Sequence, residues 1–401
     1  MQLILNLEIG GAQEVVRTLV KYLAAGCTPV VCTFQDGPVR HEIEQLGIPV
    51  EILPSRKHSI VALPLFLGDM LRIWKALAAL VRKYDLDVVQ THLLTSLDYL
   101  VLALRYTTRL RAVYWTFHSF NFEIDGAQLT RHRWLLGPKK LTHRLLYRWA
   151  ARLVDGYIAI SDQVGQALVD VIGPIGRKVE VIANGVDVAQ YAEPGAAGPS
   201  VRAELGLDES ARLIAMVGTL KEVKGHGYMI EAMSALAPRF PDLHLMLAGD
   251  GELRAQLEAQ VSAAGLDDRI HFLGSRSDVA DLLAASDLFV LPSLWEGLSM
   301  ALLEAMATGL PIVASKVSGT VQAIVPGEHG LLIPPGETEA IVNAIAQVLS
   351  DPDRARAMGL AAKRRVIAEF SAQKQAEKHL ELYSRTLYKK PARAGFVPKG
   401  V

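Results

Sequence analysis

Short runs of β-branched and aliphatic residues recur along this chain of 401 residues, separated by stretches long enough for amphipathic helices. Such alternation predicts strand–helix–strand units and a parallel sheet. The series occurs twice, and the chain is too long for one ordinary hydrophobic core, so we expect an α/β protein with two sheets. The expected strands are 3–7, 29–34, 88–91, 112–116 and 156–160 in the first half, and 213–217, 243–248, 270–273, 288–291 and 311–314 in the second.

A stretch without apolar periodicity separates the two series. Residues 191–200 hold two prolines and two glycines, which is typical of a linker. We also expect one or two helices near the C-terminus, closing the second domain, before a tail with little periodicity. The predicted organisation is an N-terminal domain 1–190, the linker 191–200, a C-terminal domain 201–370, a closing helix 371–388 and a loosely ordered tail 389–401.

Charge and cysteine content exclude several classes of protein. The 42 Lys and Arg residues balance 42 Asp and Glu residues, so no whole-chain field would attract nucleic acid. Only Cys27 and Cys32 occur, which gives neither a disulfide framework nor zinc-ligand spacing. The start has no charged region typical of a signal peptide, and no apolar run is long enough to cross a bilayer. We therefore expect a cytoplasmic protein that binds no nucleic acid.

Ligands of doubly wound sheets bind beyond the carboxyl ends of the strands, so residues that follow strands are the first candidates. Gly10 and Gly11 follow the first strand, where paired glycines let a backbone approach a phosphate near a helix N-terminus. A tight turn explains them equally well. His118 follows the strand 112–116, where it could bind a ligand or handle a proton. The alternative is a partly buried histidine with a purely structural role.

The loop after the first strand of the second series carries cations. Gly218 and Thr219 are followed by Lys224, which could neutralise a diphosphate. The residue after Lys224 is glycine, so the loop is not a P-loop. Farther on, Gly249 begins a Gly-Asp-Gly turn that lacks the third glycine of the dinucleotide fingerprint, because Arg254 stands there. A nicotinamide cofactor is therefore not expected.

The stretch 292–305 is the most informative. It holds Glu296 and Glu304, and Gly297 between them predicts that the first lies in a loop and the second two turns into a helix. Amides of the first helical turn, near 298–300, would attract an anion such as a phosphate. The carboxylates could then accept hydrogen bonds from a ribose and a sugar. An amphipathic helix with a capping acid is the structural alternative.

This Glu-x7-Glu pattern resembles the signature of the retaining glycosyltransferase family 4. The resemblance covers nearly the whole chain. It implies a GT-B fold, two facing Rossmann-like domains with a cleft between them, and a retaining transferase that needs neither metal nor cofactor and takes a UDP- or GDP-sugar. Further matching positions are 10–12, 118, 160–161, 184–187, 224–225, 249–251, 272–274, 327 and 330–332.

The resemblance also assigns roles to residues. It implies that Lys224, His118 and Glu296 serve the reaction, with Glu296 on the transferred sugar, and that Glu304 binds ribose. Gly11 would approach the donor phosphates, and Leu273 would meet the base through its main chain. The full set implied for donor binding is Gly10, Gly11, Gly218, Thr219, Lys224, Gly249, Leu273, Glu296, Gly297, Leu298, Ser299, Met300 and Glu304.

Two positions depart from the family pattern. Thr219 stands where an arginine is usual, and Gln322 stands in a turn that often carries a glutamate. These departures keep two alternatives open: a nucleotide-sugar-binding protein with impaired catalysis, and a GT-B epimerase or phosphorylase.

The segment 131–149 combines basic and aromatic residues. It carries Lys139, Lys140 and Arg144 among other cations, no acid, and Trp134 and Trp149. Such a segment suits contact with an anionic membrane surface, which could be the inner face of the membrane. The acceptor could then be a lipid-linked sugar used to build a cell-surface glycan or glycolipid. A helix with a solvated basic face is the alternative, and a sugar or another small molecule could equally be the acceptor.

Overall fold

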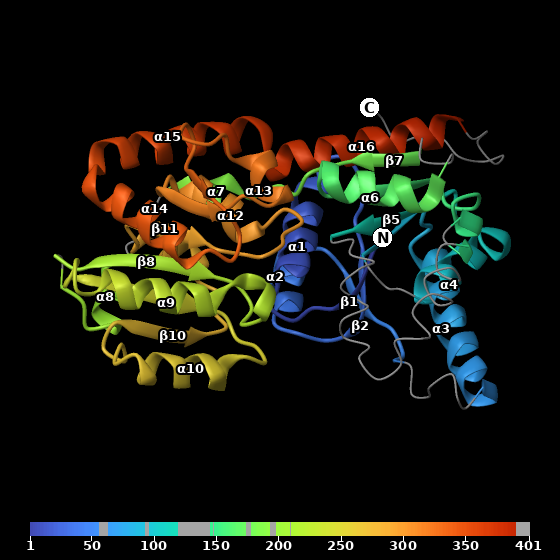
Figure 1. The fold of residues 1–401 in the computed structure, drawn as a ribbon. Helices are drawn as coiled ribbons and strands as arrows, with labels where there is room; N and C mark the ends of the chain where they lie inside the picture. Colours follow the sequence, from blue (N-terminus) through green and yellow to red (C-terminus); the bar gives the residue numbers. More distant parts are fainter. Residues whose placement is uncertain are drawn as a thin grey trace. The chain divides into compact units, whose positions relative to one another are not determined.

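The computed structural model describes residues 1–55, 63–92, 96–118, 145–146, 148–173, 178–192, 198–208 and 210–389 (Figure 1). Contacts divide the chain into two compact units. The first contains residues 1–8, 12–183 and 375–401, and the second contains 9–11 and 184–374. Each unit has its own parallel sheet, so the α/β class with two domains is confirmed.

Within the described residues, the first sheet has seven parallel strands in the order β3-β2-β1-β4-β5-β6-β7. The strands are β1 (Gln2–Asn6), β2 (Val31–Gln35), β3 (Val50–Ile52), β4 (Val88–His92), β5 (Ala112–Phe117), β6 (Gly156–Ala159) and β7 (Val179–Val181). The helices of this unit are α1 (Gly11–Leu23), α2 (Val39–Gln45), α3 (Leu63–Lys83), α4 (Ser96–Thr107), α6 (Asp162–Ile172) and α16 (Ala372–Lys389).

The second sheet has six parallel strands in the described residues, in the order β10-β9-β8-β11-β12-β13. They are β8 (Arg212–Val217), β9 (Leu243–Ala248), β10 (Ile270–Gly274), β11 (Leu288–Leu291), β12 (Ile312–Ser315) and β13 (Leu331–Ile333). The helices are α7 (Val188–Ala192), α8 (Gly198–Glu204), α9 (His226–Leu236), α10 (Arg254–Ala263), α11 (Val279–Ala284), α12 (Met300–Thr308), α13 (Ser318–Ala323), α14 (Thr338–Ser350) and α15 (Pro352–Glu369), with a short 3-10 turn η4 (Glu222–Lys224).

Both sheets reverse their strand order at one point. The order changes direction between β1 and β4 in the first sheet and between β8 and β11 in the second. Loops that leave the two central strands at such a reversal diverge, which leaves room for a ligand at their carboxyl ends. The reversal therefore marks where each unit can bind a ligand.

Apolar strands and apolar helix faces form the cores. In the second unit, Met229, Met233 and Leu236 of α9 pack with strand residues such as Leu245 and Val290, all of them buried. Helix boundaries follow local chemistry: Ser161 caps α6 by accepting a hydrogen bond from the amide of Val164, and Asp351 caps α15 in the same way ahead of Pro352.

The division of the chain differs from the predicted one in two respects. The boundary falls between Ala183 and Asn184, and the predicted linker 191–200 lies inside the second unit, where its described residues belong to α7 and α8. Gly198 and Pro199 begin a short helix here rather than joining domains.

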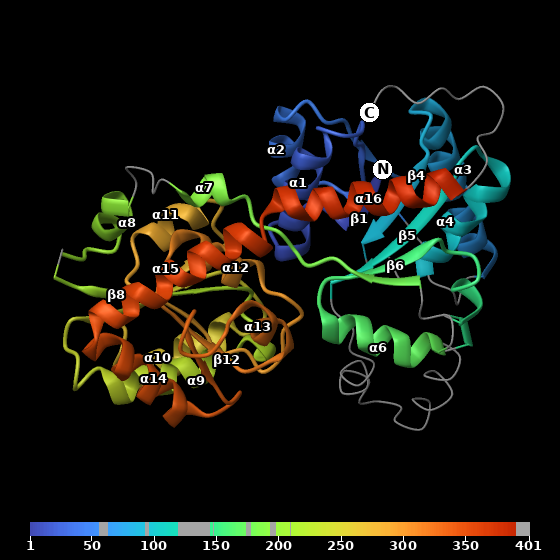
Figure 2. The same ribbon diagram turned by 90° about the horizontal axis from the view of Figure 1, so that it is seen from above.

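The C-terminal prediction is right about the helices and wrong about the domain. Two helices, α15 and α16, are present, but from Gln375 onward the chain belongs to the first unit. Ala376, Leu382 and Tyr383 of α16 pack with Tyr114 of β5 and Leu19 of α1. Figure 2 shows the ribbon of α16 crossing α1. The apolar face of α16 therefore completes the first core. The predicted tail lies outside the described residues except for Lys389.

Candidate functional site

The predicted donor-binding residues of the second unit gather at the reversal of its sheet. The loop with Gly218 and Thr219 leaves β8, and the loop 292–299 leaves β11, its neighbour in the sheet. Thr219 is exposed, as a residue of a ligand-binding loop should be, while Gly297, Leu298 and Ser299 are buried. The topology thus brings together two segments that are far apart in the sequence.

An ion pair joins these two loops. Lys224 Nζ donates a hydrogen bond to Glu296 Oε1 over 2.6 Å, and the two side chains are only 19% and 10% exposed. Ser293 Oγ donates to the same carboxylate oxygen at 2.8 Å. Two donors on one oxygen hold the Glu296 side chain in one rotamer. The predicted cation and the predicted sugar-binding carboxylate are therefore direct partners in this structure.

Glycines allow the loops to approach this closely. Gly225 has φ of +75°, and a Cβ there would lie 2.2 Å from the carbonyl oxygen of Pro292. A Cβ on Gly319 would lie 1.6 Å from the carbonyl oxygen of Gly297. Any side chain at either position would force the loop around Glu296 to move. Ser318 Oγ adds a hydrogen bond of 2.8 Å to the main-chain oxygen of Glu296.

Helix α12 begins directly after this loop. It starts at Met300, and Ser299 at its N-cap makes no side-chain capping bond. The first amides of a helix have no partner within the helix and carry partial positive charge, which favours an anion. Asn184 Nδ2 donates to the carbonyl oxygen of Leu298 at 3.0 Å and so holds the start of the helix. The predicted positions of these residues are confirmed; their roles stay predictions.

Glu304 lies nearer the helix start than predicted. Because α12 begins at Met300, Glu304 is little more than one turn into the helix rather than two. Its side chain is buried, at 6% exposure. A carboxylate held at such a buried position can accept hydrogen bonds from a hydroxyl-rich group.

Gly249 and Leu273 complete the second unit's predicted set. Gly249 has φ of +143°, and a Cβ there would lie 2.0 Å from the carbonyl oxygen of Gly218. Its amide donates to the carbonyl of Gly274 at 2.8 Å, which ties it to the end of β10. Leu273, in β10, is partly buried. Both residues thus border the same carboxyl edge of the sheet as Lys224.

The remaining predicted residues belong to the carboxyl edge of the first sheet. Gly10 lies between β1 and α1, Gly11 begins α1, and His118 follows β5 directly. His118 Nε2 lies 2.9 Å from Nδ1 of His92, the last residue of β4, and the two rings stack. Burial lowers the pKa of His118 to about 4, with a further contribution from His379. His118 is therefore neutral near pH 7.

Sequence reasoning assigned no role to several residues that hold these side chains. They are Ser293 and Ser318 beside Glu296, Asn184 beside Leu298, and His92 beside His118. One signal was available: the last three residues of β4, Gln90, Thr91 and His92, are polar although the strand belongs to a parallel sheet. Serines in loops carry no comparable signal.

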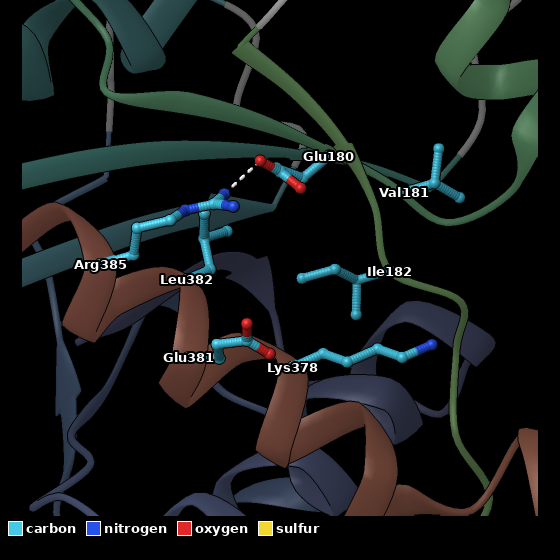
Figure 3. Close-up of a pocket in the computed structure, with 7 residues that line it drawn as sticks. All are labelled: Glu180, Val181, Ile182, Lys378, Glu381, Leu382 and Arg385. Carbon is cyan, nitrogen blue, oxygen red and sulfur yellow. Dashed lines mark hydrogen bonds and ion pairs between the residues drawn. The ribbon is translucent and has the colours of Figure 1, made fainter.

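Other kinds of site find no support in the described part of the chain. It contains no cluster of His, Cys, Asp and Glu arranged to hold a metal ion. None of its helices combines the length and apolar character needed to cross a membrane. A small pocket lies between β7 and α16, lined by charged residues such as Lys378 and by the Glu180–Arg385 ion pair (Figure 3), and it includes none of the predicted residues. The basic segment lies outside the described residues except for 145–146, 148 and 149.

Two family models match the chain. Residues 9–190 match Glycosyltransferase Family 4, and residues 199–365 match Glycosyl transferases group 1. The two matches together cover every strand of the two sheets except β1, and they include every predicted site residue.

Individual relatives agree with these matches. The chain is 30% identical over 318 residues to an Escherichia coli UDP-Gal:alpha-D-GlcNAc-diphosphoundecaprenol alpha-1,3-galactosyltransferase, covering 77% of this chain and 78% of the relative. It is 31% identical over 243 residues to the lipopolysaccharide core biosynthesis mannosyltransferase LpsB of Rhizobium meliloti, covering 59% and 67%. The crystal structure of Anabaena Alr3699/HepE in complex with UDP and glucose superposes with a TM-score of 0.79 at 22% identity, covering 96% of this chain and all of that one.

Proposed function

Because this chain belongs to glycosyltransferase family 4 and is a glycosyltransferase with a GT-B-type pair of Rossmann-like units, we propose that it moves a sugar from a nucleotide sugar to an acceptor hydroxyl with retention of anomeric configuration. The observation that carries this proposal is the Lys224–Glu296 pair next to the start of α12. A cation, a carboxylate and free helix amides in one place match a diphosphate with a sugar attached to it.

Different groups of the site bind different parts of the donor. Lys224 and the amides of Ser299 and Met300 neutralise the diphosphate, so no metal ion is needed for this purpose. Glu304 accepts hydrogen bonds from the ribose hydroxyls, and Glu296 accepts them from the transferred sugar. Four glycines without side chains let the backbone approach the phosphates closely: Gly10, Gly11, Gly218 and Gly249. Leu273 contacts the base through its main chain. The proposal includes no cofactor.

The reaction follows from this arrangement of charge. The bond between the anomeric carbon and the diphosphate oxygen breaks, and the acceptor oxygen attacks from the same face. The leaving phosphate oxygen takes the proton of the acceptor hydroxyl. Negative charge grows on the diphosphate in the transition state, and the preorganised cation and amides stabilise it there. Since the acceptor oxygen itself forms the new bond to the anomeric carbon, the chain supplies no nucleophile.

UDP-sugars are the first donors to test. The name of the Escherichia coli relative specifies UDP-Gal, and the Anabaena structure holds UDP and glucose. GDP-sugars are the second choice, because the main-chain contact assigned to Leu273 can serve either base.

We propose a lipid-linked acceptor at the inner face of the cytoplasmic membrane, in the synthesis of a cell-surface glycan or glycolipid. The basic and aromatic segment 131–149 supports peripheral contact with anionic lipid. The Escherichia coli relative is named for a diphosphoundecaprenol acceptor, which agrees with this class.

Thermal unfolding with a panel of UDP-, GDP- and ADP-sugars tests the donor. A ligand at a hundred times its dissociation constant adds roughly 2.7 kcal/mol to the free energy of unfolding, which a melting curve detects easily. Incubation of the stabilising donor with lipid-linked and soluble acceptors, followed by NMR of the product anomer, then tests transfer and retention. Binding without transfer to any acceptor would favour an impaired enzyme, and an inverted product would overturn the mechanism.

A further inference from the structure

A row of buried polar side chains connects helix α16 with His118. Its members come from two strands, β1 and β4, and from α16, which are distant in the sequence, and each member from α16 to His92 is at most 7% exposed. Starting from the helix they are His379, Gln90, Tyr383, Gln2 and His92. All belong to the first unit.

The direction of these hydrogen bonds is set by a main-chain carbonyl. His379 Nδ1 lies 2.8 Å from the carbonyl oxygen of Gln375, which can only accept, so Nδ1 carries the proton. Burial lowers the pKa of His379 to about 4, so its ring is neutral and Nε2 is an acceptor. The amide nitrogen of Gln90 donates to that Nε2 at 3.4 Å and to Thr116 Oγ1 at 2.7 Å. The orientation of the Gln90 amide follows from these two acceptors.

The same order of donors and acceptors continues through Tyr383. Since the amide nitrogen of Gln90 is engaged, its oxygen Oε1 faces Tyr383, and the Tyr383 hydroxyl donates to it. The hydroxyl oxygen then accepts from the amide nitrogen of Gln2 at 3.2 Å. This leaves Oε1 of Gln2 facing Nε2 of His92 at 2.8 Å. A carbonyl oxygen only accepts, so Nε2 of His92 carries the proton.

The order ends at His118. Burial lowers the pKa of His92 well below its usual range, so this ring is neutral and its Nδ1 is bare. His118 Nε2, 2.9 Å away, must therefore donate to it. In a neutral ring with a proton on Nε2, the other nitrogen is an acceptor. The tautomer of His118 is thus determined by a carbonyl group on α16.

We propose that Tyr383 and His379 are positioning residues that keep His118 in the Nε2–H tautomer, so that Nδ1 is presented as an acceptor for a sugar hydroxyl. This inference rests on the proposed function and on the role in the reaction that the family resemblance implies for His118. It also specifies the ligand group: a bare nitrogen binds a hydroxyl and repels a phosphate oxygen, whereas the opposite tautomer would donate to phosphate. His118 would then discriminate the sugar from the diphosphate of the same donor.

Histidine side-chain NMR tests the tautomer without any substrate. Long-range ¹H–¹⁵N spectra of ligand-free protein labelled at histidine distinguish protonated from bare nitrogens, and His118→Gln and His92→Gln assign the signals. We expect proton on Nε2 for His118 and His92 and on Nδ1 for His379. A proton on Nδ1 of His118 would overturn the proposal, whatever the enzyme transfers.

Tyr383→Phe tests the coupling. It removes the hydroxyl between Gln90 and Gln2, and we expect the His92 and His118 signals to shift toward a mixture of tautomers. In transfer assays kcat should fall roughly fivefold to tenfold, the effect of about one hydrogen bond, with unchanged affinity for nucleotide. Tyr114→Phe is the matched control, because its hydroxyl also bonds to α16, at Thr386 Oγ1 and the Leu382 carbonyl, but lies outside this row.

The outcomes separate the two proposals. If Tyr383→Phe changes the tautomers while kcat stays at the wild-type value, the tautomer of His118 does not serve sugar binding and the proposal is overturned, although transfer stands. If the protein transfers no sugar, the NMR result still tests the order of hydrogen bonds. Should Tyr383→Phe fail to fold, His379→Gln breaks the row at its first side chain and should shift the same two signals.

Discussion

Lys224 Nζ lies 2.6 Å from Glu296 Oε1, which joins the loop after β8 to the loop after β11. The two charges neutralise each other while the site holds no ligand. A bound diphosphate offers Lys224 a second anion, and Ser293 keeps Glu296 in place when the cation turns toward it. In the proposed function the pair holds both groups in place for the donor, and the opposite charges reduce the cost of burying each other.

Substitution of the two glutamates should separate transfer from binding. Glu296→Ala should mainly lower kcat, because this carboxylate is proposed to hold the reacting sugar, and Glu304→Ala should mainly raise the dissociation constant of the nucleotide. A hydrogen bond to a charged group contributes roughly 1.5–3 kcal/mol, so each effect should be at least tenfold. Calorimetry with UDP and steady-state kinetics measure the two quantities.

Ser318→Ala serves as a control for these variants, because the Ser318 hydroxyl donates to the main-chain oxygen of Glu296 and not to its carboxylate. It should change both quantities less than either glutamate variant. Equal and small effects of Glu296→Ala and Glu304→Ala would contradict the assigned division.

Gly319→Ala should disrupt the nucleotide site. The added Cβ would lie 1.6 Å from the carbonyl oxygen of Gly297, so the loop that carries Glu296 has to move. We expect nucleotide affinity to fall and the free energy of unfolding to drop by roughly 1–3 kcal/mol. Gly227→Ala in helix α9 should preserve binding, because the added Cβ would lie 3.5 Å from its nearest neighbour, Oε1 of Gln260. Wild-type affinity in Gly319→Ala would show that this close approach is dispensable.

Thr219→Arg should preserve folding, because Thr219 is exposed in the loop after β8. It restores the cation that the family pattern has at this position, so the affinity for nucleotide sugar should rise or stay the same. Melting temperature and titration calorimetry check the two statements. Unfolding, or weaker donor binding, would show that this loop contributes differently from the proposal.

Acid should destabilise the second unit through His226. Burial, followed by the charge of Lys224, lowers the pKa of His226 to about 4, below its ordinary value of 6.5. Between these values the unfolded state binds more protons, so stability is full above pH 6.5 and is lost as pH falls toward 4. The slope from one such group reaches at most about 1.4 kcal/mol per pH unit.

His226→Leu should therefore flatten the dependence of the free energy of unfolding on pH in this window. Denaturant titrations at several pH values measure it, and His41→Leu, at an exposed histidine, is the control. An unchanged slope in His226→Leu would mean that other groups cause the acid sensitivity.

Charge reversal at Lys139, Lys140 and Arg144 should reduce sedimentation with anionic vesicles and leave donor binding unchanged. Each basic residue near an anionic surface contributes on the order of 1 kcal/mol, so the loss should exceed tenfold. Salt should weaken wild-type binding, since the attraction decays over a Debye length of about 8 Å at physiological ionic strength. If wild-type protein ignores such vesicles at low salt, the lipid-linked acceptor loses its main support.

The sequence alone was sufficient for the features that depend on local order. Strand–helix alternation predicted two parallel sheets, because each strand must be buried on both faces by the helices that follow it. The position of Glu296 in a loop and of Glu304 in a helix followed from Gly297 between them. Short strands such as β3, β7 and β13 escaped prediction, since three residues carry too little pattern.

The tertiary structure decided which distant residues meet. Local composition could not show that residues from Gln375 onward join the first unit, because the partners of that helix, Tyr114 and Leu19, lie far earlier in the chain. The same holds for Lys224 on Glu296 and for the row from Tyr383 to His118. Such hydrogen bonds form only once strands and helices have packed, so their geometry exists in the folded chain and not in any single segment of the sequence.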